Sequence, residues 1–381
     1  MIRILHTSDW HLGKTVYGKS MLPDQEYFIE EIFFPLVRRE RPDCVLLAGD
    51  IYDRQIAPVE AIRLFDRVIS ELSRERISLV AITGNHDGAD RVAVGTSLLE
   101  QQGVILANRL EKEIRPVILE REGRRIHIYP LPYFEPEQAR ALYPDQKIGQ
   151  MQDAYAAVLQ GIRENMDPSA LHILVAHCFI AGCTLSDSEN PLSVGGSVQV
   201  AGNLLDGFDY VALGHLHAPQ RAGKTGRYSG SPLKYSFDES HHKKSMVMLE
   251  IGEEISMHVI PVIPHRDMRR IQGTFQELVE IGKRNPSEDY LFVTLTDRTP
   301  VYLPMEQLRV YYPNLLGLRS EWMTMGDPSV ESSDGGGFQK RQSDEEIFDA
   351  FMRQICEIEP TLEDENSFQS AREREEKGET V

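Results

Sequence analysis

The sequence predicts an α/β fold built of stacked layers of sheet and helix, followed by a smaller second domain. Two observations predict this class. Short apolar runs typical of strands alternate with longer amphipathic stretches typical of helices. The chain of 381 residues also exceeds the usual length of one domain, so two domains and a tail are expected.

Strands are predicted where short runs of apolar residues end at a polar residue, glycine or proline. They cover Ile2–His6, Cys44–Ala48, Leu79–Thr83, Arg125–Pro130, His172–Ala176, Tyr210–Leu213 and Ser245–Glu250. Helices are predicted where apolar residues recur every three or four positions. They cover Gln25–Arg39, Val59–Arg74 and Gln152–Asn165.

A domain boundary is predicted in the proline-containing stretch 260–266, which reads Ile-Pro-Val-Ile-Pro-His-Arg. It is expected to be a strand leading into a connector, because each proline removes a ladder donor. The first domain is therefore placed at 1–263 and a small second α/β domain at 264–325. Within the second domain, Thr274 is a predicted helix N-cap. Two strands and a helix are expected there, at Met268–Gln272, Tyr290–Thr296 and Phe275–Lys283.

The C-terminal part of the sequence predicts a linker, one helix and an acidic tail. Residues 326–342 include three consecutive glycines and are typical of a flexible linker. Residues 343–358 open with a capping-box pattern and gather apolar side chains on one helical face. That face is expected either to bind a partner or to fold back onto its own domain. Residues 359–381 carry eight acidic and three basic residues, which predicts a solvated tail.

The net charge of −18 argues against a protein that binds nucleic acid by overall basicity, although much of the excess lies in the C-terminal tail. We expect a cytoplasmic protein without membrane contact, because the sequence has neither a leader-like start nor an apolar run long enough to cross a bilayer. The four cysteines are expected to be reduced. Cys178 and Cys183 are alternative metal ligands, but histidines fill the ligand pattern around them.

Polar residues follow five of the strand-like runs, at positions where loops project side chains into a shared site. Their order along the chain is Asp-x-His, Gly-Asp, Gly-Asn-His-Asp, His and Gly-His-x-His. A single such group is more often a turn or a structural histidine, but the joint series predicts one site. The candidate metal ligands are Asp9, His11, Asp50, Asn85, His177, His215 and His217.

Carboxylate, imidazole and amide oxygen ligands together suit Mn, Fe or Zn better than an all-oxygen magnesium site. The ligand supply exceeds the needs of one ion, and Asp50 is the candidate that bridges two. Two cations roughly 3.5–4 Å apart activate a water and stabilise an in-line displacement at phosphorus. The predicted reaction is therefore phosphoester hydrolysis.

The series resembles the calcineurin-like metallophosphoesterase superfamily over residues 1–249. The residues around these motifs are similar to the SbcD family. The similar segments are Leu5–Lys14, Gly49–Asp53, Tyr228–Pro232 and Ser236–Glu239. The resemblance implies a layered α/β/β/α sandwich, a smaller α+β capping domain and a C-terminal helical tail. It also implies a manganese-dependent DNA nuclease of repair, recombination and replication, acting as a double-strand 3′–5′ exonuclease and a single-strand or hairpin endonuclease.

The resemblance also assigns roles to individual residues. Asp9, His11, Asp50 and His217 would hold one ion, and Asp50, Asn85, His177 and His215 the other. His86 would face the scissile phosphate and stabilise the transition state or protonate the leaving oxygen, and Asp87 would orient it. Many relatives carry a further histidine where this sequence has Asp53, so that histidine's role is not transferred.

Family resemblance implies an SbcC-type coiled-coil ATPase as partner, gripped by the helix at 343–358. It implies double-stranded and hairpin DNA as substrate and a homodimer within a heterotetramer, formed by the helices at Gln25–Arg39 and Val59–Arg74. The alternative for these helices is packing on the sheet. Two other functions stay open: a phosphatase or phosphodiesterase for a smaller substrate, and a non-catalytic scaffold with a structural metal site.

Three short segments near the motifs allow both a functional and a purely structural interpretation. Gly230-Ser231-Pro232 is either close to the site or simply a turn. The basic run His241–Lys244 either contacts DNA or is a solvated face. The arginines at 266, 269 and 270 carry the same two interpretations.

Overall fold

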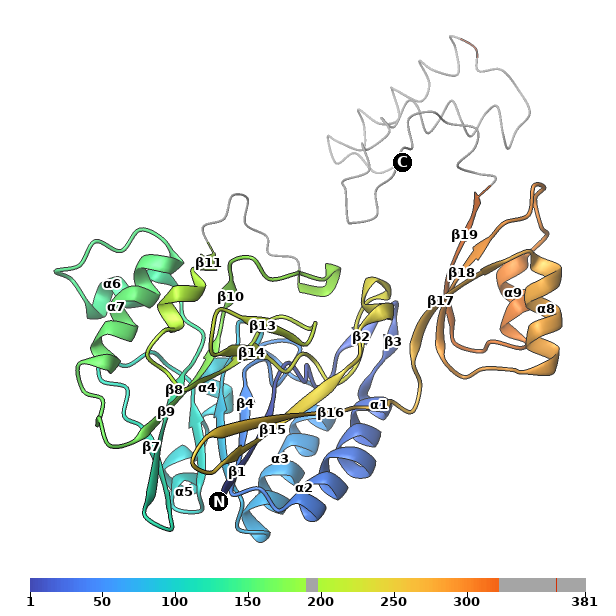
Figure 1. Cartoon of the computed structure of the whole chain (residues 1–381). Coiled ribbons are helices and arrows are strands. Elements are labelled where there is room, and N and C mark those ends of the chain that lie inside the picture. Colours follow the sequence, from blue (N-terminus) through green and yellow to red (C-terminus); the bar gives the residue numbers. More distant parts are fainter. Residues whose placement is uncertain (190–197, 322–360, 362–381) are drawn as a thin grey trace, which may run out of the picture. The chain divides into compact units, whose positions relative to one another are not determined.

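The computed structural model describes residues 1–189, 198–321 and 361 (Figure 1). Residues Met1–Gly326 form one compact unit. The predicted linker, partner-binding helix and acidic tail at 326–381 lie outside the described residues, apart from residue 361.

The first sheet has the strand order β16-β15-β1-β4-β5-β6 (Figure 1). β1, β4, β5 and β6 run parallel, while β15 is antiparallel to β1 and β16 to β15. The strands are β1 (Ile2–Thr7), β4 (Cys44–Ala48), β5 (Ser78–Ile82), β6 (Val104–Ala107), β15 (Ser245–Ile251) and β16 (Ile255–Pro261). The predicted strands at the positions of β1, β4, β5 and β15 are confirmed.

The second sheet has the order β13-β14-β12-β9-β8-β7. Its central strands β8, β9, β12 and β14 are parallel, and the edge strands β7 and β13 are antiparallel to their neighbours. The strands are β7 (Val117–Arg121), β8 (Arg124–Leu131), β9 (Leu171–His177), β12 (Tyr210–Gly214), β13 (Gln220–Ala222) and β14 (Gly226–Tyr228). The predictions at β8, β9 and β12 are confirmed.

Three apolar layers hold this domain together. Alternate residues of both sheets, such as Ile4, Leu46, Val175 and Ala212, form a core between the sheets. The intervening residues of the first sheet pack with helices on its outer face, and those of the second sheet do the same on the other side. Because side chains of a strand alternate between its faces, strands buried on both sides read as the continuous apolar runs seen in the sequence.

The helices fall on the outer faces of the two sheets. The predicted helix at Gln25–Arg39 is a single helical stretch made of α1 (Leu22–Tyr27), a π-helical segment η1 (Phe28–Phe33) and α2 (Phe34–Glu40). The other two predicted helices are α3 (Val59–Arg74) and α7 (Met151–Arg163). Shorter elements without a clear sequence period are α4 (Ala89–Val92), α5 (Thr96–Glu100), α6 (Pro136–Leu142), η2 (Asp187–Glu189), η3 (Gly202–Leu205) and η4 (Phe237–His241). Two small two-stranded sheets comprise β2 (Thr15–Val16) with β3 (Lys19–Ser20) and β10 (Phe179–Ile180) with β11 (Gln199–Val200).

The stretch 260–266 is the end of a strand followed by a connector, as predicted, because β16 ends at Pro261. After it comes a three-stranded sheet of order β17-β18-β19. Both strand pairs are parallel, and a helix connects each pair. This corrects the α+β description of the second domain to α/β, since parallel neighbours require crossover connections. Its elements are β17 (Met268–Gly273), α8 (Phe275–Arg284), β18 (Tyr290–Leu295), α9 (Pro304–Arg309) and β19 (Leu315–Ser320).

Thr274 caps α8 as predicted. Its side chain accepts a hydrogen bond from the backbone N–H of Glu277, and the Glu277 carboxylate accepts one from the backbone N–H of Thr274. This reciprocal pair satisfies donors that a helix start otherwise leaves free. The sequence therefore located the start of this helix to the residue.

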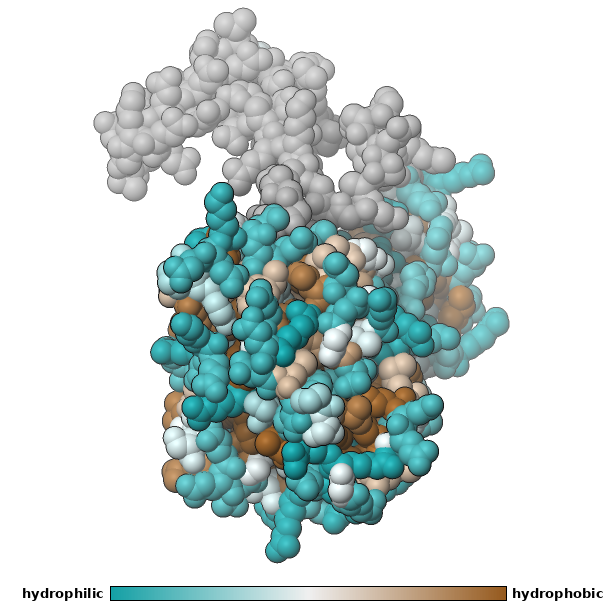
Figure 2. Space-filling view, turned by 60° about the vertical axis from the view of Figure 1, so that its left-hand side comes forward, coloured by the Kyte–Doolittle hydropathy of each residue, from teal (hydrophilic) through white to brown (hydrophobic). Residues whose placement is uncertain are grey.

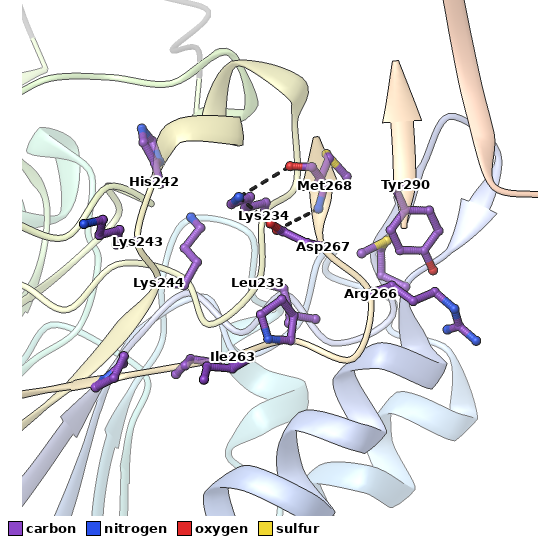
Figure 3. Close-up of a pocket in the computed structure, with 14 residues that line it drawn as sticks. Leu233, Lys234, His242, Lys243, Lys244, Ile263, Arg266, Asp267, Met268 and Tyr290 are labelled. Atoms are coloured by element: carbon purple, nitrogen blue, oxygen red, sulfur yellow. Dashed lines mark hydrogen bonds and ion pairs between the residues drawn. The ribbon is translucent and has the colours of Figure 1, made fainter. Parts of the chain in front are cut away.

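Buried ion pairs join the connector and the second domain to the first. Asp24 of α1, which is 1% exposed, accepts hydrogen bonds from Arg266 at 3.1 and 3.2 Å and from the hydroxyl of Tyr290. Lys234 pairs with Asp267 at 2.8 Å and donates to the carbonyl oxygens of Ser240 and Met268 (Figure 3). These contacts border a cavity of about 240 Å³. The polar groups of the connector are thus largely satisfied within the chain.

Hydrophilic residues cover most of the face shown in Figure 2, and the hydrophobic patches on it are small and separate. This distribution agrees with the burial of most large apolar side chains in the layers described above. Among the helices that the structure describes, none combines the length and the apolar character needed to span a membrane.

Candidate metal centre

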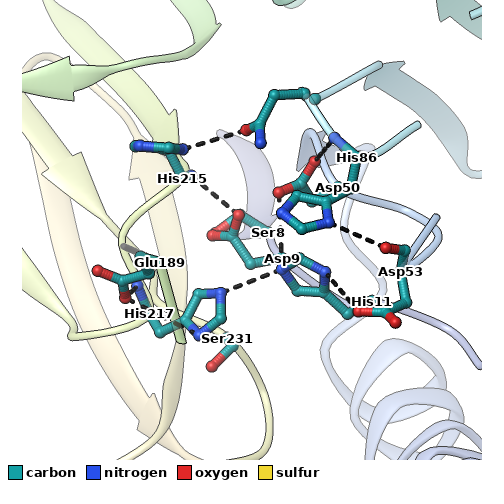
Figure 4. Close-up of polar contacts among 12 residues, drawn as sticks. Ser8, Asp9, His11, Asp50, Asp53, His86, Glu189, His215, His217 and Ser231 are labelled. Carbon is teal, nitrogen blue, oxygen red and sulfur yellow. Dashed lines mark hydrogen bonds and ion pairs between the residues drawn. The ribbon is translucent and has the colours of Figure 1, made fainter. Parts of the chain in front are cut away.

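All seven candidate ligands lie together at one end of the two sheets. Figure 4 labels five of them: Asp9, His11, Asp50, His215 and His217. Asp9 and His11 follow β1, Asp50 follows β4, and Asn85 follows β5 in the first sheet. His177 ends β9, and His215 and His217 follow β12 in the second sheet. Carboxyl ends of parallel strands meet at the same edge of a sheet, and here two such edges face one another. The fold therefore brings these seven residues together, as the sequence predicted.

The loops after β1 and β4 are tied to each other by backbone hydrogen bonds. The N–H of Asp9 donates to the carbonyl of Gly49 at 3.1 Å, and the N–H of His11 donates to the carbonyl of Asp50 at 2.9 Å. Asp9, His11 and Asp50 have φ angles of 54°, 46° and 49°, in the left-handed region. Each such conformation costs a non-glycine residue of order 1–3 kcal/mol and is found mainly where function demands it.

Asp50 lies at the centre of the site. Its Oδ2 is 3.5 Å from Nε2 of His11 and 3.4 Å from Nε2 of His177. Its Oδ1 accepts a hydrogen bond from the backbone N–H of His86 at 2.9 Å. One carboxylate therefore faces ligand candidates from both sheets, as a bridging ligand must.

Three potential ligand atoms converge on one side of Asp50. Nδ1 of His177 lies 2.9 Å from the carbonyl oxygen of Ala48, which can only accept, so this nitrogen donates and Nε2 keeps a lone pair. That lone pair faces Oδ1 of Asn85 at 3.0 Å. Nδ1 of His215 lies 3.2 Å from the same oxygen. Two imidazole nitrogens within 3.2 Å of one amide oxygen are atom types that bind Mn, Fe or Zn, so the residues fit a metal ion.

A second group of ligand atoms lies on the other side of Asp50. Nε2 of His11 and Nε2 of His217 are 3.0 Å apart. One ligand atom each of Asp9, His11 and His217 fall within 4.8 Å of one another, and the same holds for Asp9, Asp50 and His177. All five of these side chains are buried, which keeps water away from the ligand atoms. The arrangement supplies two overlapping ligand sets.

Two glycines allow the sheets to approach this closely. A Cβ added to Gly214 would lie 1.7 Å from the carbonyl oxygen of Ala48, and one added to Gly84 would lie 2.1 Å from Oδ1 of Asp50. Both distances are far below any van der Waals contact. A side chain does not fit at either position, so the motifs Gly-His-x-His and Gly-Asn-His-Asp require glycine there.

The electrostatics of the site favour a bound cation. Burial alone would raise the pKa of Asp50, but the rings of His177 and His11 hold it well below its usual range. Burial raises the pKa of Asp9. Despite its burial, the neighbouring Asp50 raises the pKa of His177 to about 9, so a proton is held there when no cation is bound. Burial lowers the pKa values of His11 and His215 to about 3.

His86 borders the site. One of its ring nitrogens lies within 4.8 Å of ligand atoms of His11 and Asp53, but His86 is not in the groups that contain Asp9 or Asp50. Its Nδ1 lies 2.9 Å from the carbonyl oxygen of Asp53, so this nitrogen donates and Nε2 is free. Its ring centroid is 4.8 Å from that of His11, edge to face. His86 also lines the cavity over the ligands. This position suits a group that acts on a bound substrate.

Asp87 does not contact the His86 ring in the way the sequence suggested. Its carboxylate accepts hydrogen bonds from the backbone N–H groups of Ile51 and Gly84, and from that of Tyr52 at 2.8 Å. It therefore joins the loops after β4 and β5. The partner that holds the His86 ring is the Asp53 carbonyl, because the Asp87 side chain is buried away from the ring and already used by three donors.

Asp53 accepts a hydrogen bond from Lys14 at 2.7 Å. Its carboxylate also lies 3.5 Å from Nδ1 of His11. Burial alone would raise the pKa of Asp53, but His11 and Lys14 lower it to about 2. A permanently charged carboxylate here supports His11 rather than a phosphate.

Sequence reasoning assigned no role to several residues that contact the ligands. Ser8 donates to Oδ2 of Asp9 at 2.6 Å. Ser188, Glu189 and Glu239 surround His217. These three lie in the short 3-10 helices η2 and η4, which have no strand-then-polar signature, although Glu239 belongs to the quoted Ser236–Glu239 motif. The tertiary structure was needed to find them.

Several residues of the basic segments are engaged within the chain, whereas His241 and Lys243 are exposed. Lys244 is 4% exposed and bonds to Glu239, so it does not belong to a solvated basic face. Arg269 pairs with Asp289 at 2.6 Å, and Arg270 donates to the carbonyl of Phe237. Ser231 of the Gly-Ser-Pro element donates its backbone N–H to the carbonyl of His217 at 3.3 Å, which places that turn beside the site.

A cavity of about 640 Å³ opens over the ligands. His11, Asp50, Asn85, His215 and His217 lie on its floor side, and His86 borders it. Tyr133, Phe179 and Met151 form an apolar part of its wall. The cavity is large enough for a nucleotide-sized group to reach the metal-binding atoms.

Residues 2–219 match the protein family described as calcineurin-like phosphoesterase. Residues 264–355 match the family described as type 5 capsule protein repressor C-terminal domain, SbcD_C. The chain is 33% identical over 322 residues to the SbcD subunit of the nuclease SbcCD from Staphylococcus epidermidis (strain ATCC 12228 / FDA PCI 1200), a match covering 83% of this chain and 85% of that protein.

The chain is a calcineurin-like metallophosphoesterase of the SbcD family. It is accordingly a hydrolase, and the buried histidine and aspartate groups around Asp50 are consistent with the two-metal site of such an enzyme. A solved structure, the NitN amidase from Neterenkonia sp. AN1, is 12% identical and aligns over 68% of this chain and 92% of that one with a TM-score of 0.24. So low a score carries no argument about the fold.

Proposed function

We propose that this SbcD-family protein is the manganese-dependent nuclease subunit of an SbcCD-type complex, cutting DNA phosphodiesters in repair, recombination and replication. The observation that carries the proposal is the convergence of two ligand sets on Asp50. Two ions are held by Asp9, His11, Asp50 and His217 and by Asp50, Asn85, His177 and His215. The mixture of imidazole and carboxylate ligands favours manganese over magnesium.

When bound, the ions supply an activated water and neutralise charge at the scissile phosphate. The residues of the chain fix this chemistry in place. Asp50 holds its orientation through the backbone N–H of His86, and His177 through the carbonyl of Ala48. His86 keeps Nε2 free towards the cavity, where it donates a hydrogen bond to the developing charge or a proton to the leaving oxygen.

DNA is proposed as the substrate from the family and from the second domain. The relative from Staphylococcus epidermidis is named as a nuclease subunit, and its similarity extends over both domains of this chain. We place the domain boundary at 263/264, where the second family match begins. The domain from 264 to 325 is proposed to cap the site and select DNA, with double-strand 3′–5′ exonuclease and single-strand or hairpin endonuclease activity.

The proposed partner is an SbcC-type coiled-coil ATPase, because the relative's name describes one subunit of SbcCD. The segment 343–358 is the candidate contact, joined by the linker 326–342 and followed by the tail 359–381. Deletion of residues 343–381 is expected to abolish co-purification with the ATPase and to leave the basal nuclease activity intact. Unchanged assembly would assign the contact elsewhere.

A homodimer is proposed through the start of α3. Most apolar residues of this helix pack on the sheet, but Val59 and Ile62 are 56% and 48% exposed, and Ile56 before the helix is 67% exposed. An exposed apolar cluster of this kind is typical of a contact surface. Ile62→Glu is expected to shift the mass measured by light scattering from dimer to monomer, and Arg63→Glu on an exposed neighbouring position serves as the control.

The decisive experiment measures cleavage of linear and hairpin-ended duplexes with Mn²⁺, by the purified chain with and without the ATPase. A nucleotide monoester is assayed in parallel. Cleavage of DNA by either preparation, lost in Asp50→Asn, is the expected result. Turnover of the monoester without any cleavage of DNA would instead support the alternative phosphatase function, and metal binding without turnover would support a scaffold.

A further inference from the structure

A buried carboxylate, Glu239, lies behind the candidate ligand His217. Oε1 of Glu239 is 3.2 Å from Nδ1 of His217, and the Glu239 side chain is fully buried. Ser188 bridges the same pair, because its hydroxyl lies 2.9 Å from Nδ1 and donates to Oε1 of Glu239 at 2.6 Å. The hydroxyl hydrogen points to the carboxylate, so the Ser188 oxygen accepts from the ring. Both neighbours of Nδ1 are therefore acceptors.

This geometry decides which ring nitrogen of His217 carries hydrogen. Nδ1 faces two acceptors and must donate, which leaves the lone pair on Nε2. Nε2 faces Nε2 of His11 at 3.0 Å, inside the proposed metal site. Histidine ligands of metals commonly donate their other nitrogen to a carboxylate, which fixes the tautomer and the ring orientation.

Glu189, a second acidic residue near His217, contacts the backbone of this residue and not its ring. Its Oε1 accepts a hydrogen bond from the backbone N–H of His217, but lies 3.8 Å from the ring nitrogen Nδ1. That distance is too long for a hydrogen bond. Glu189 therefore holds the backbone of the loop, and the ring is left to Glu239 and Ser188.

A buried lysine neutralises Glu239 from the other side. Nζ of Lys244 lies 2.5 Å from Oε2 of Glu239, and also donates to the carbonyl of His217 at 2.9 Å and to Ser231 at 2.8 Å. Burial alone would raise the pKa of Glu239, but Lys244 and His217 hold it well below its usual range. All three lysine hydrogens are used. Oε2 is thus committed to Lys244, while Oε1 remains for His217.

The segment that carries Glu239 is also fixed from outside the site. Glu239 lies on η4, and its neighbour Phe237 packs against Phe292 of the second domain with ring centroids 5.4 Å apart. Arg270 of β17 donates to the carbonyl of Phe237 at 3.1 Å. The carboxylate behind His217 is therefore held on a segment that contacts both domains.

We infer that Glu239 is the positioning residue for His217, and that Ser188 and Lys244 hold its carboxylate in the orientation that presents Nε2 to the metal site. The inference rests on the proposed metal-binding function. Without Glu239 the ring loses its main anchor, and a ligand of one ion becomes free to rotate. The loss of such an anchor typically weakens metal binding by about 10–100-fold.

The test compares four variants of the full chain: Glu239→Gln, Glu239→Gln with Lys244→Met, Ser188→Ala and the control Asp238→Asn. Asp238 is adjacent on η4, and its hydrogen bonds in the part of the chain that the structure describes go to Asp187 and Ser236 rather than to His217. Mn²⁺ binding is measured by calorimetry, the ligand geometry by the visible absorption of the Co²⁺-loaded protein, and folding by thermal unfolding.

Glu239→Gln is expected to weaken one of two Mn²⁺ sites by about 10–100-fold and to change the Co²⁺ spectrum, and Asp238→Asn to leave both unchanged. In Glu239→Gln, Lys244 loses its charged partner. The double variant also removes this lysine, so it separates the loss of support for His217 from the effect of an unpaired buried lysine. Persistent weak binding in the double variant supports positioning. Wild-type binding in the double variant, or in Glu239→Gln itself, would overturn it.

Ser188→Ala keeps the test decisive if the Glu239 variants do not fold, because it deletes one hydroxyl. It is expected to weaken the same site by several-fold and to shift the Co²⁺ spectrum in the same direction. Unchanged Mn²⁺ binding together with an unchanged spectrum in this variant would count against the inference. Absence of Mn²⁺ binding by the wild-type protein would be a failure of the proposed function instead.

Discussion

Nε2 of His177 lies 3.0 Å from Oδ1 of Asn85, although both atoms carry lone pairs. The carbonyl of Ala48 takes the hydrogen of Nδ1, so the ring cannot donate to Asn85 from Nε2 unless it is protonated. Burial alone would lower the pKa of His177, but the neighbouring Asp50 raises it to about 9. In the proposed function, a cation bound here would accept both lone pairs.

Removal of metal is expected to lower the melting temperature. A ligand present at 100 times its dissociation constant stabilises the folded state by about 2.7 kcal/mol per site. For the first domain alone, each kcal/mol corresponds to roughly 2 °C. Thermal unfolding with Mn²⁺ and with EDTA should therefore differ by several degrees. The difference should vanish in Asp50→Asn, and an equal difference in that variant would argue against a bridging role for Asp50.

Replacement of His86 by Ala is expected to leave the metal content unchanged and to slow cleavage by about 10²–10⁴-fold, the usual contribution of a positioned proton donor. The reason is its location outside the ligand sets, with Nε2 free. Metal content is measured by elemental analysis and cleavage under saturating Mn²⁺. The exposed His241→Ala serves as the control. Loss of metal from the His86 variant would make His86 a ligand.

Asp87→Asn is expected to lower the free energy of unfolding by about 1–3 kcal/mol, the usual cost of leaving a buried hydrogen-bond donor without its acceptor. An amide has one acceptor oxygen, whereas the Asp87 carboxylate uses both oxygens to accept from three backbone N–H groups. Urea unfolding measures the change. If Asp87 acted only on His86, cleavage would fall without a change in stability.

Gly214→Ala is expected to lower the free energy of unfolding by about 3 kcal/mol or more, because a Cβ there would lie 1.7 Å from the Ala48 carbonyl oxygen. The two sheets would have to separate at the site. Gly149→Ala is a matched control, since its Cβ would meet nothing closer than 3.4 Å. Urea unfolding of both variants measures the effect, and equal stability of the two would contradict the close approach of β12 and β4.

Stability is expected to fall as the pH drops below about 6.5, in part because of His6. This ring is buried between the sheets, where Nε2 donates to the carbonyl of Leu213 and Nδ1 accepts from the Tyr210 hydroxyl at 2.9 Å. Burial lowers the pKa of His6 to about 3. Between pH 6.5 and 3 the unfolded chain then binds more protons than the folded one. The stability contributed by the neutral His6 ring is therefore fully present above pH 6.5 and is lost as the pH falls towards 3.

The contribution of His6 has a slope of at most about 1.4 kcal/mol per pH unit. His6→Gln should therefore flatten the pH dependence of the free energy of unfolding between pH 6 and 4, whatever it does to the absolute stability. The exposed His258→Gln should not. An unaltered slope in the His6 variant would show that this ring is already protonated in the folded state.

The sequence by itself determined the long buried strands β1, β4, β5, β8, β9 and β12, the two long helices α3 and α7, and the seven polar side chains that converge at the candidate metal centre. Buried parallel strands are continuous apolar runs, so their ends are visible in the chain, and ligands placed at those ends must converge. The sequence did not reveal the edge strands β7 and β13 or the short helices α4–α6, because partly exposed and short elements lack a sustained period.

Only the tertiary structure decided how the ligands are supported. Glu239, Ser188 and Lys244 surround His217 from positions far apart in the chain, and the 3-10 segments that carry two of them have no periodic signal. It also decided that Asp87 bonds to backbone N–H groups while the Asp53 carbonyl holds His86. Such contacts depend on the distance between atoms from separate loops, and those distances exist only once the two sheets have packed against each other.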